Sequence, residues 1–403
     1  MRRTTRAAIA VCTALGAALA GGCAGSTPGG AATSTETMEP ITITVSDLAN
    51  EHHSTAVGLR TWADEVTART GGKVRFEYFW SGSLAPGNEA LDALGGGLAQ
   101  LGGVIPDYFD QELPTAQWFT GLLGVLSPAS PHGFLQGSLA ADEFFKQPAV
   151  EAEFAEHNLK VVSAAVTEPY SLLCTKPSET LAQTTGLRAR TAGATRNAEL
   201  AALGLTAVNL PPDDVYDGMQ RGVIDCTVAA KSLMSTYGLW EVAPYFTPVG
   251  ITPALRVNAM NLDVWNALPP DVQKVMMDAV PTYIAGIVRA ELDAYAKLFG
   301  PDGPAAKVHL QNPAELGEHV RRAQAERLTG LAAHAPATIA DPADEVRRFR
   351  ESAAAWLAVV LDDMGVPEPR LDTPEAIRAS FVEGAAFDLD RWVELVRAKR
   401  GGS

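Results

Sequence analysis

Hydrophobic residues between positions 41 and 300 follow two alternating spacings. Apolar residues lie three and four positions apart over residues 59–66, which predicts an amphipathic helix, whereas apolar and charged residues alternate over residues 73–79, which predicts a strand. Further strands are expected near residues 41–45, 101–105, 159–166, 171–175, 186–190, 223–226 and 256–261, and helices near 58–70, 89–94, 142–157, 198–203 and 213–221. This alternation predicts an α/β protein built from two successive units.

The strongest helical period begins at Pro269 and continues to Tyr295. About 28 residues at 1.5 Å each make a helix about 42 Å long, which is more than one lobe needs. Pro281 lies within it and predicts a kink. We therefore expect a long helix that spans two lobes. Further helices are expected near residues 313–334, 342–364 and 373–399, and these either brace the hinge or swap between two protomers.

The N-terminus has the pattern of an export signal. Three arginines precede a run of small apolar residues at 7–20, which is too short and too poor in Leu and Ile to span a membrane. Residues 19–23 resemble the bacterial lipobox, although Ala20 stands where Leu is usual. We expect residues 1–22 to be removed and Cys23 to carry a lipid on the outer face of the cytoplasmic membrane. An unmodified secreted protein is the alternative.

Composition separates the rest of the chain into a tether and a body. Residues 23–40 are rich in Gly, Ser, Thr and Pro, and they are expected to form a flexible tether with a reach of about 22 Å. The body is too long for one core, so two lobes are expected. Lobe I would comprise residues 41–165 plus 253–295, and lobe II residues 166–252 plus 296–403. A net charge of −15 argues against nucleic acid or an anionic membrane surface as the main partner.

Two cysteines remain in the predicted body, Cys174 and Cys226. In an oxidising compartment they can form a disulfide, which would close a loop of about 50 residues and stabilise the fold by about 4 kcal/mol in the chain-entropy model. Two buried free thiols are the alternative, and the sequence leaves both open.

Motifs for catalysis, nucleotide binding and structural metal binding are missing from the sequence. It contains no G-x-S-x-G, Walker A or H-E-x-x-H pattern. The glycines at 95–97 and 102–103 are expected to serve packing or turns, and Glu51-His52-His53 to form a polar turn, since no third metal ligand is placed by spacing. We therefore expect no cofactor, no metal and no enzymatic activity.

One stretch could bind an anion. In Gly186-Leu187-Arg188-Ala189-Arg190 the two arginines alternate with apolar residues, which places both on one face of a short strand. An arginine at the end of such a strand can present two parallel N–H groups to a carboxylate. The alternative is that this stretch is an exposed edge strand whose arginines are simply solvated.

Four stretches of the sequence, together with the order in which they occur, resemble the extracytoplasmic solute-binding proteins of TRAP transporters, the DctP family. They are DEVTARTGGKVRFEYFWSGSL at 64–84, GLRAR at 186–190, the segment from Asp214 to Asp225, and VWNALPPDVQ at 264–273. The resemblance covers most of residues 41–300. It implies a two-lobe periplasmic-binding-protein fold of the type II kind, which closes on a small solute and delivers it to TRAP membrane subunits driven by an ion gradient. The resemblance also places Arg190 at the position where an arginine of the family binds the ligand carboxylate.

The other contact positions of the family fall mostly on apolar residues here. They correspond to Leu48, Ile105, Tyr170, Pro212 and Ala229. A dicarboxylate would leave its second polar end unpaired in such a site, at a cost of roughly 1–3 kcal/mol per group. The expected ligand is therefore an organic monocarboxylate with an apolar or aromatic body, held by Arg190 with help from Tyr170. Four aromatic residues could pack near its tail, although a core position is the ordinary role of each: Trp80, Trp118, Tyr237 and Trp240.

Two other functions are compatible with the same fold. The receptor could serve an ABC importer or a sensor kinase instead of a TRAP transporter. The scaffold could also carry an enzyme, but no nucleophile is placed beside a base in the sequence.

Overall fold

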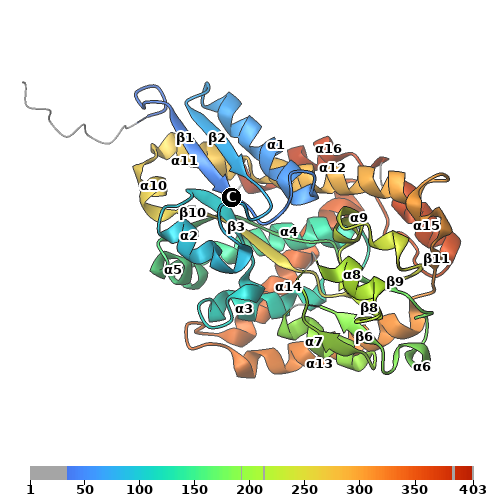
Figure 1. The fold of residues 1–403 in the computed structure, drawn as a ribbon. Coiled ribbons are helices and arrows are strands. Elements are labelled where there is room, and N and C mark those ends of the chain that lie inside the picture. The colour runs from blue at the N-terminus through green and yellow to red at the C-terminus, as the bar shows by residue number, and fades with distance from the viewer. Residues whose placement is uncertain (1–33, 192, 212–213, 384–385, 402–403) are drawn as a thin grey trace, which may run out of the picture.

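The computed structural model describes residues 34–191, 193–211, 214–383 and 386–401. Within these residues the chain forms two β-sheets covered by helices, which are the centres of two lobes (Figure 1). The predicted α/β class and two-lobe fold are thereby confirmed. The predicted signal segment, Cys23 and Pro212 lie outside the described residues.

The first lobe is built on a five-stranded mixed sheet in the order β2-β1-β3-β10-β4. Strand β1 runs parallel to β2 and β3, whereas β10 runs antiparallel to β3 and β4. The parallel strands are joined by helices, so this part is the predicted β-α-β-α-β unit. The elements are β1 (Ile41–Ser46), α1 (Ser54–Arg69), β2 (Val74–Phe79), α2 (Ala90–Gly95), β3 (Leu101–Val104), η2 (Pro106–Tyr108), α3 (Pro114–Thr120), η3 (Gly121–Val125), α4 (His132–Phe145), α5 (Pro148–Glu156), β4 (Leu159–Val166), β10 (Leu255–Asn261) and α10 (Leu262–Ala267).

The second lobe is built on a six-stranded sheet in the order β11-β9-β5-β8-β6-β7. Strand β5 runs antiparallel to β8 and β9, whereas β6 runs parallel to β7 and β8. The elements are β5 (Tyr170–Cys174), α6 (Leu181–Thr184), β6 (Arg188–Arg190), α7 (Ala194–Ala202), β7 (Thr206–Val208), α8 (Val215–Gln220), β8 (Cys226–Ala229), α9 (Lys231–Thr236), β9 (Tyr245–Ile251) and β11 (His309–Leu310).

Two short segments and one helix join the lobes. The chain crosses from β4 to β5 through residues 167–169 and returns from β9 to β10 through residues 252–254. The expected long helix is two helices, α11 (Pro270–Asp278) and α12 (Val280–Phe299), and Pro281 lies in the first turn of α12, where its missing N–H is not needed. Helix α12 packs on α1 of the first lobe and on α9 of the second, and Figure 1 shows it extending from α1 towards α15.

A buried polar cluster fixes this junction. Glu168, in the first crossover, forms a 2.5 Å ion pair with Lys231 of α9. Glu291 of α12 accepts a hydrogen bond from the hydroxyl of Ser54 in α1 (3.0 Å). Burial and the nearby Glu168 carboxylate raise the pKa of Glu291 well above its usual range. The neutral form of Glu291 therefore avoids a second buried negative charge at the junction.

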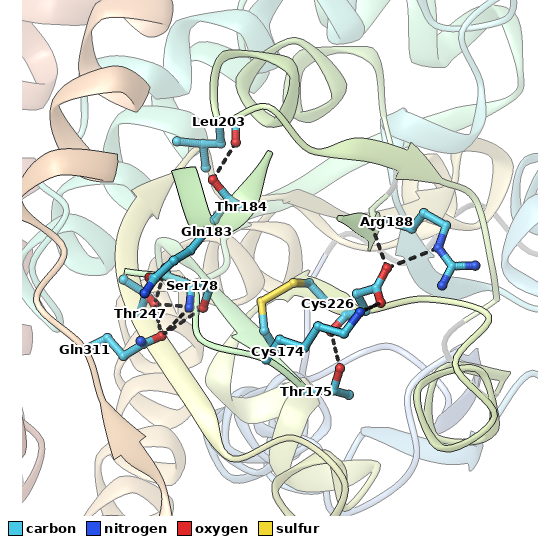
Figure 2. Close-up of a disulfide and its surroundings, with 12 residues drawn as sticks. Cys174, Thr175, Ser178, Gln183, Thr184, Arg188, Leu203, Cys226, Thr247 and Gln311 are labelled. Carbon is cyan, nitrogen blue, oxygen red and sulfur yellow. Dashed lines mark hydrogen bonds and ion pairs between the residues drawn. A yellow bond between two sulfur atoms is a disulfide. The ribbon is translucent and has the colours of Figure 1, made fainter. Parts of the chain in front are cut away.

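A disulfide joins Cys174 to Cys226, which face each other on the antiparallel strands β5 and β8 (Figure 2). This is one of the two states that the sequence leaves open. The neighbouring Asp225 accepts from Lys176 Nζ (2.8 Å) and from the backbone and side-chain nitrogens of Arg188. Although burial opposes ionisation, these hydrogen bonds lower the pKa of Asp225 to about 2. The ends of β5, β6 and β8 near Asp225 are thus linked both by the disulfide and by ion pairs.

Four helices follow the two lobes: α13 (Ala314–Leu331), α14 (Pro342–Ala358), α15 (Pro374–Glu383) and α16 (Leu389–Gly401). Helix α13 packs on β9 and α7 of the second lobe and on η3 of the first. Its Arg327 pairs with Glu199 of α7 (2.6 Å) and also donates to the Thr252 hydroxyl in the second crossover (3.2 Å) and to the Gly121 carbonyl (3.4 Å). In this chain the extension therefore packs across the junction between the lobes.

The described end of the predicted tether is not free. Met38 is buried at 4% exposure, and the backbone and hydroxyl of Thr35 both donate to Asp271 (2.9 and 2.6 Å). Lys73 donates to the Met38 carbonyl (2.9 Å). The expectation of a flexible tether up to residue 40 is therefore wrong from residue 34 onward, because one apolar side chain and these hydrogen bonds fix the segment to the first lobe.

Among the differences from the predicted elements, two can be explained by local chemistry. Strand β8 begins at Cys226 rather than at Val223, because the N–H groups of Val223 and Ile224 both donate to the Gly218 carbonyl and close the end of α8 (2.8 and 3.2 Å). Strand β9 was not expected, and it contains Pro248, a residue that is uncommon within strands.

The contact between α1 and α12 can be tested at Gly58. A Cβ at this position would lie 2.8 Å from the Tyr283 carbonyl oxygen and would overlap the Ile287 side chain. We expect Gly58→Ala to lower the free energy of unfolding by about 1–3 kcal/mol despite the better helix propensity of alanine. The matched control is Gly330→Ala in α13, where a Cβ would meet nothing within 4 Å. Urea unfolding should show the control unchanged or stabilised, and equal effects of both changes would contradict this packing.

Candidate functional site

A cavity of about 110 Å³ lies between the two lobes. The first lobe contributes residues that follow β1 and β3, together with the start of β10. The second lobe contributes side chains from β5, β6, α7 and α9, and the crossovers contribute Thr167 and Ala254. One water needs about 10–15 Å³ of such space, so the cavity has room for a small molecule rather than for a single water. A pocket at the junction of two lobes is a common place for a small-molecule site.

Arg190 enters this cavity from the end of β6. It is only 6% exposed, and its Nε donates to the Leu210 carbonyl (2.9 Å). Burial lowers the pKa of Arg190, while the nearby Tyr170 and Tyr108 hydroxyls oppose that change, and the group remains charged. Among the described residues no carboxylate lies within ion-pair distance of it. Arg190 is therefore a buried cation whose charge these residues do not neutralise.

A second arginine, Arg196 of α7, is paired across the lobes. It forms an ion pair with Asp107 of η2, and both side chains are almost fully buried (3% and 4% exposed). Arg196 Nη1 also donates to the Pro253 carbonyl (3.2 Å), and the guanidinium lies 5.4 Å from the centre of the Tyr170 ring. Burial opposes the charged form, but Asp107 outweighs it and raises the pKa of Arg196. This pair bridges the cleft beside Arg190.

A third arginine, Arg256 of β10, is paired within the first lobe. Its two Nη atoms contact the two carboxylate oxygens of Asp47, which follows β1 directly. The guanidinium crosses β3 at Gly103, where a Cβ would lie 2.6 Å from Nη1. Asp47 also accepts from the Ala49 backbone N–H (2.8 Å). The glycine thus makes room for a buried and paired arginine in the cavity wall.

His53 caps helix α1 at the same wall. Its Nδ1 accepts from the Thr55 backbone N–H (3.3 Å), an N-cap hydrogen bond. Burial, and then the charge of Arg256, lower the pKa of His53 to about 4, although Asp47 acts in the opposite direction. His53 is therefore neutral near pH 7 and adds no charge to the cavity.

The charges of the described residues around the cavity sum to one positive unit. Three arginines line it, and Asp107 and Asp47 neutralise two of them. Much of the remaining wall is apolar and includes Leu48, Ile105, Leu233, Ala254 and Leu255. The arrangement can hold a small molecule that carries one negative charge and an apolar body.

Four of the predicted site residues come together here: Arg190, Tyr170, Leu48 and Ile105 all line the cavity. Ala229 is fully buried in β8 opposite Ser171 and is not among the described residues of the cavity wall. Pro212 lies outside the described residues. Of the aromatic candidates, Tyr237 lines the cavity.

Three tryptophans are placed elsewhere in the fold. Trp80 stacks on Tyr78 with ring centres 4.9 Å apart, Trp118 donates to the Leu331 carbonyl (2.9 Å), and Trp240 packs among phenylalanines. Each therefore has the core or packing role that is ordinary for tryptophan.

The expectation of a mostly apolar site needs correction, because sequence reasoning missed several polar residues. An acidic residue, Asp107, lines the cavity two positions after Ile105, and a second arginine, Arg196, lies beside the Tyr170 ring although it is 26 positions away in the sequence. Asp47 and Asp107 each follow a parallel strand, and the carboxyl ends of β1 and β3 meet at one edge of the sheet. Polar residues just after buried parallel strands were the signal that could have found them.

No group of three or more metal-ligating side chains is found in the described ranges. A search of the same residues finds no helix that is both long and apolar enough to cross a bilayer.

Comparison with known proteins gives a family. The model of the DctP family, described as bacterial extracellular solute-binding protein, family 7, matches residues 45–294. The chain belongs to this family. A monocarboxylate 2-oxoacid-binding periplasmic protein from Nostoc sp. is 26% identical over 235 residues. That match covers 56% of this chain and 61% of the relative, so this chain spans less than two thirds of the relative's length.

Solved structures of DctP-type receptors share the fold. DctP7 of Bordetella pertussis, a receptor that binds pyroglutamic acid, has a TM-score of 0.62 at 18% identity, covering 78% of this chain and 99% of its own. A marine metagenome TRAP solute-binding protein specific for aromatic acids, solved with 3-hydroxybenzoate, has a TM-score of 0.66 at 18% identity, covering 79% and 99%. At these identities the likeness shows the fold alone.

The low pKa of His53 predicts a pH dependence of stability. Its folded pKa of about 4 lies below the ordinary value of 6.5, so the unfolded chain binds the proton first as the pH falls. The stability that wild type has above pH 6.5 should decrease by on the order of 2 kcal/mol as the pH falls towards 4. His53→Asn keeps a capping oxygen but cannot titrate. Urea unfolding of both proteins at pH 7 and pH 4.5, without ligand, should show the larger loss in wild type, and equal losses would contradict the assignment.

Proposed function

We propose that this chain is the extracytoplasmic receptor of a TRAP transporter and that it captures a small organic monocarboxylate with an apolar body. The ligand carboxylate would bind Arg190 between the two lobes, with the Tyr170 ring beside it. The single observation that carries this proposal is the charge of Arg190, which no carboxylate of the described residues neutralises inside a cavity of otherwise paired charges.

The energetics favour an anionic ligand at this position. A buried charge without a partner is costly, and a carboxylate brought in by the ligand offsets that cost with two parallel charge-assisted hydrogen bonds. Closure of the lobes would exclude water and strengthen the pair. A neutral solute would leave Arg190 unpaired, so the site selects for negative charge.

The remaining wall favours a single carboxylate on an apolar body. Leu48, Ile105, Leu233 and Leu255 present side chains that cannot hydrogen-bond to a second polar group. The wall also contains uncharged polar side chains, among them Asn50, Thr55, Thr167 and Thr236, but these carry no positive charge to pair with a second carboxylate. A second ligand carboxylate would also meet Asp107, which carries the same charge. The ligands named for the similar proteins support this choice, since pyroglutamic acid and 3-hydroxybenzoate each carry one carboxylate and the Nostoc protein is named for monocarboxylate 2-oxoacids.

The cellular setting rests on the N-terminal sequence and the family. Export by residues 1–22, lipidation of Cys23 and delivery of the ligand to TRAP membrane subunits form one consistent proposal. The segment from residue 34 onward is fixed to the first lobe through Thr35 and Asp271, so the flexible part of the tether would end before it.

The direct test is binding of carboxylates to wild type and to Arg190→Ala. Loss of a buried charge pair costs about 2–5 kcal/mol, so we expect affinity for a monocarboxylate such as benzoate or 2-oxobutyrate to fall about 30-fold or more. Thermal-shift screening followed by titration calorimetry measures this effect. The control is Arg221→Ala, an exposed arginine paired with Asp217, which should bind as wild type does.

Two results would contradict the proposal. Undiminished binding by Arg190→Ala would remove Arg190 from the site. Stronger stabilisation of wild type by succinate than by any aryl or alkyl monoacid would reject the monocarboxylate class.

A further inference from the structure

A buried aspartate is unexpected in the wall of a cavity that binds an acid. Asp107 lines the same cavity as Arg190, and its side chain is only 4% exposed. Because it carries the charge of the proposed ligand, its presence opposes ligand binding unless it has another effect. Its partner Arg196, which lines the cavity beside it, suggests what that effect is.

We propose that Asp107 sets the charge class of the ligand, and this inference rests on the proposed function. By pairing with Arg196, Asp107 withholds that guanidinium from the ligand and leaves Arg190 alone to bind a carboxylate. Its own carboxylate takes the place beside Arg196 that a second ligand carboxylate would need. Asp107 is thus a specificity-determining residue that rejects dicarboxylates.

The geometry indicates that Arg196 does not depend on Asp107 for its position. Arg196 Nη1 donates to the Pro253 carbonyl (3.2 Å), and the guanidinium lies over the Tyr170 ring at 5.4 Å. Arg196 also lies at the first turns of α7, a helix fixed by the Arg327–Glu199 ion pair (2.6 Å). Removal of the Asp107 charge should therefore leave the Arg196 guanidinium at the cavity wall, without the carboxylate that now faces it.

The charge count then predicts a change of ligand class. In wild type, the three arginines and two aspartates among the described residues leave one positive charge, which matches a monoanion. With asparagine at position 107 the sum becomes two positive charges, which matches a dianion. Discrimination of this kind combines an attractive group for one ligand with a repulsive group against the other.

Asp107 also joins the lobes, because it belongs to η2 and Arg196 to α7. A role limited to this contact predicts something different from a role in specificity. Loss of an inter-lobe contact weakens every ligand by the same factor, since each ligand needs the same closure. A role in specificity changes the ratio of the affinities for diacid and monoacid.

The experiment measures this ratio by titration calorimetry with succinate and butyrate, which have the same number of carbon atoms. In Asp107→Asn we expect the ratio of succinate to butyrate affinity to rise by about 100-fold, the size typical of a buried charge pair. Asp110→Asn removes an exposed carboxylate three positions away and should leave the ratio unchanged. Equal weakening of both ligands in Asp107→Asn would overturn the inference.

A second variant covers the case in which Asp107→Asn does not fold with its extra buried charge. Asp107→Asn combined with Arg190→Ala returns the cavity to one positive charge, now on Arg196. This double variant should recover butyrate binding at least about tenfold relative to Arg190→Ala alone, and no recovery would overturn the inference. Failure of the proposed function is distinct, because it would appear as succinate preferred over butyrate by wild type itself.

Discussion

The guanidinium of Arg190 is a buried positive charge that no carboxylate among the described residues neutralises, and the surrounding structure depends on how that charge is accommodated. A charge of this kind is costly inside a protein unless it is hydrated or paired. Two short crossovers, helix α12 and the packing of α13 join the lobes around the cavity that contains it. A cleft between lobes joined in this way can hydrate Arg190 when open and pair it with a ligand when closed.

The neighbouring charges are arranged so that Arg190 alone is left for a ligand. Arg196 and Arg256 each have an aspartate, and these pairs are supported by backbone carbonyls, by Asn258 and by the space that Gly103 leaves. The strand that carries Arg190 is also firmly held, since its Ala189 pairs with Cys226 of the disulfide. In the proposed receptor Arg190 would therefore bind the ligand from a well-held strand rather than from a loop, as precise ligand recognition requires.

Much of the fold could be predicted from local spacing. Alternating strand and helix patterns predict both α/β units, because each amphipathic element needs the other to bury its apolar face. Prediction failed where chain-specific chemistry overrode the pattern, as in β9 with its Pro248 and in β8, which starts after the turn at Val223. The fixed position of Met38 could not be foreseen either, because it depends on Asp271 and Lys73, which are distant in sequence.

The site was only partly predictable, and the failures have one cause. Arg190 and Tyr170 could be located by family resemblance, whereas Asp107, Arg196, Asp47 and Arg256 act as pairs across long sequence separations. A pair such as Asp107 and Arg196 becomes visible only when the two lobes are placed together. Ile105 and Asp107 both line the cavity, but only Ile105 was expected there, so the sequence suggested a more apolar site than the structure shows.

The most direct test of the central claim is to identify the ligand that the protein retains. Wild-type protein purified under native conditions without added ligand can be denatured, and the released small molecules identified by mass spectrometry. The charge balance around Arg190 and the apolar part of the cavity wall predict a small monocarboxylic acid with an apolar body. A retained dicarboxylate, a neutral sugar or a cationic solute would contradict it.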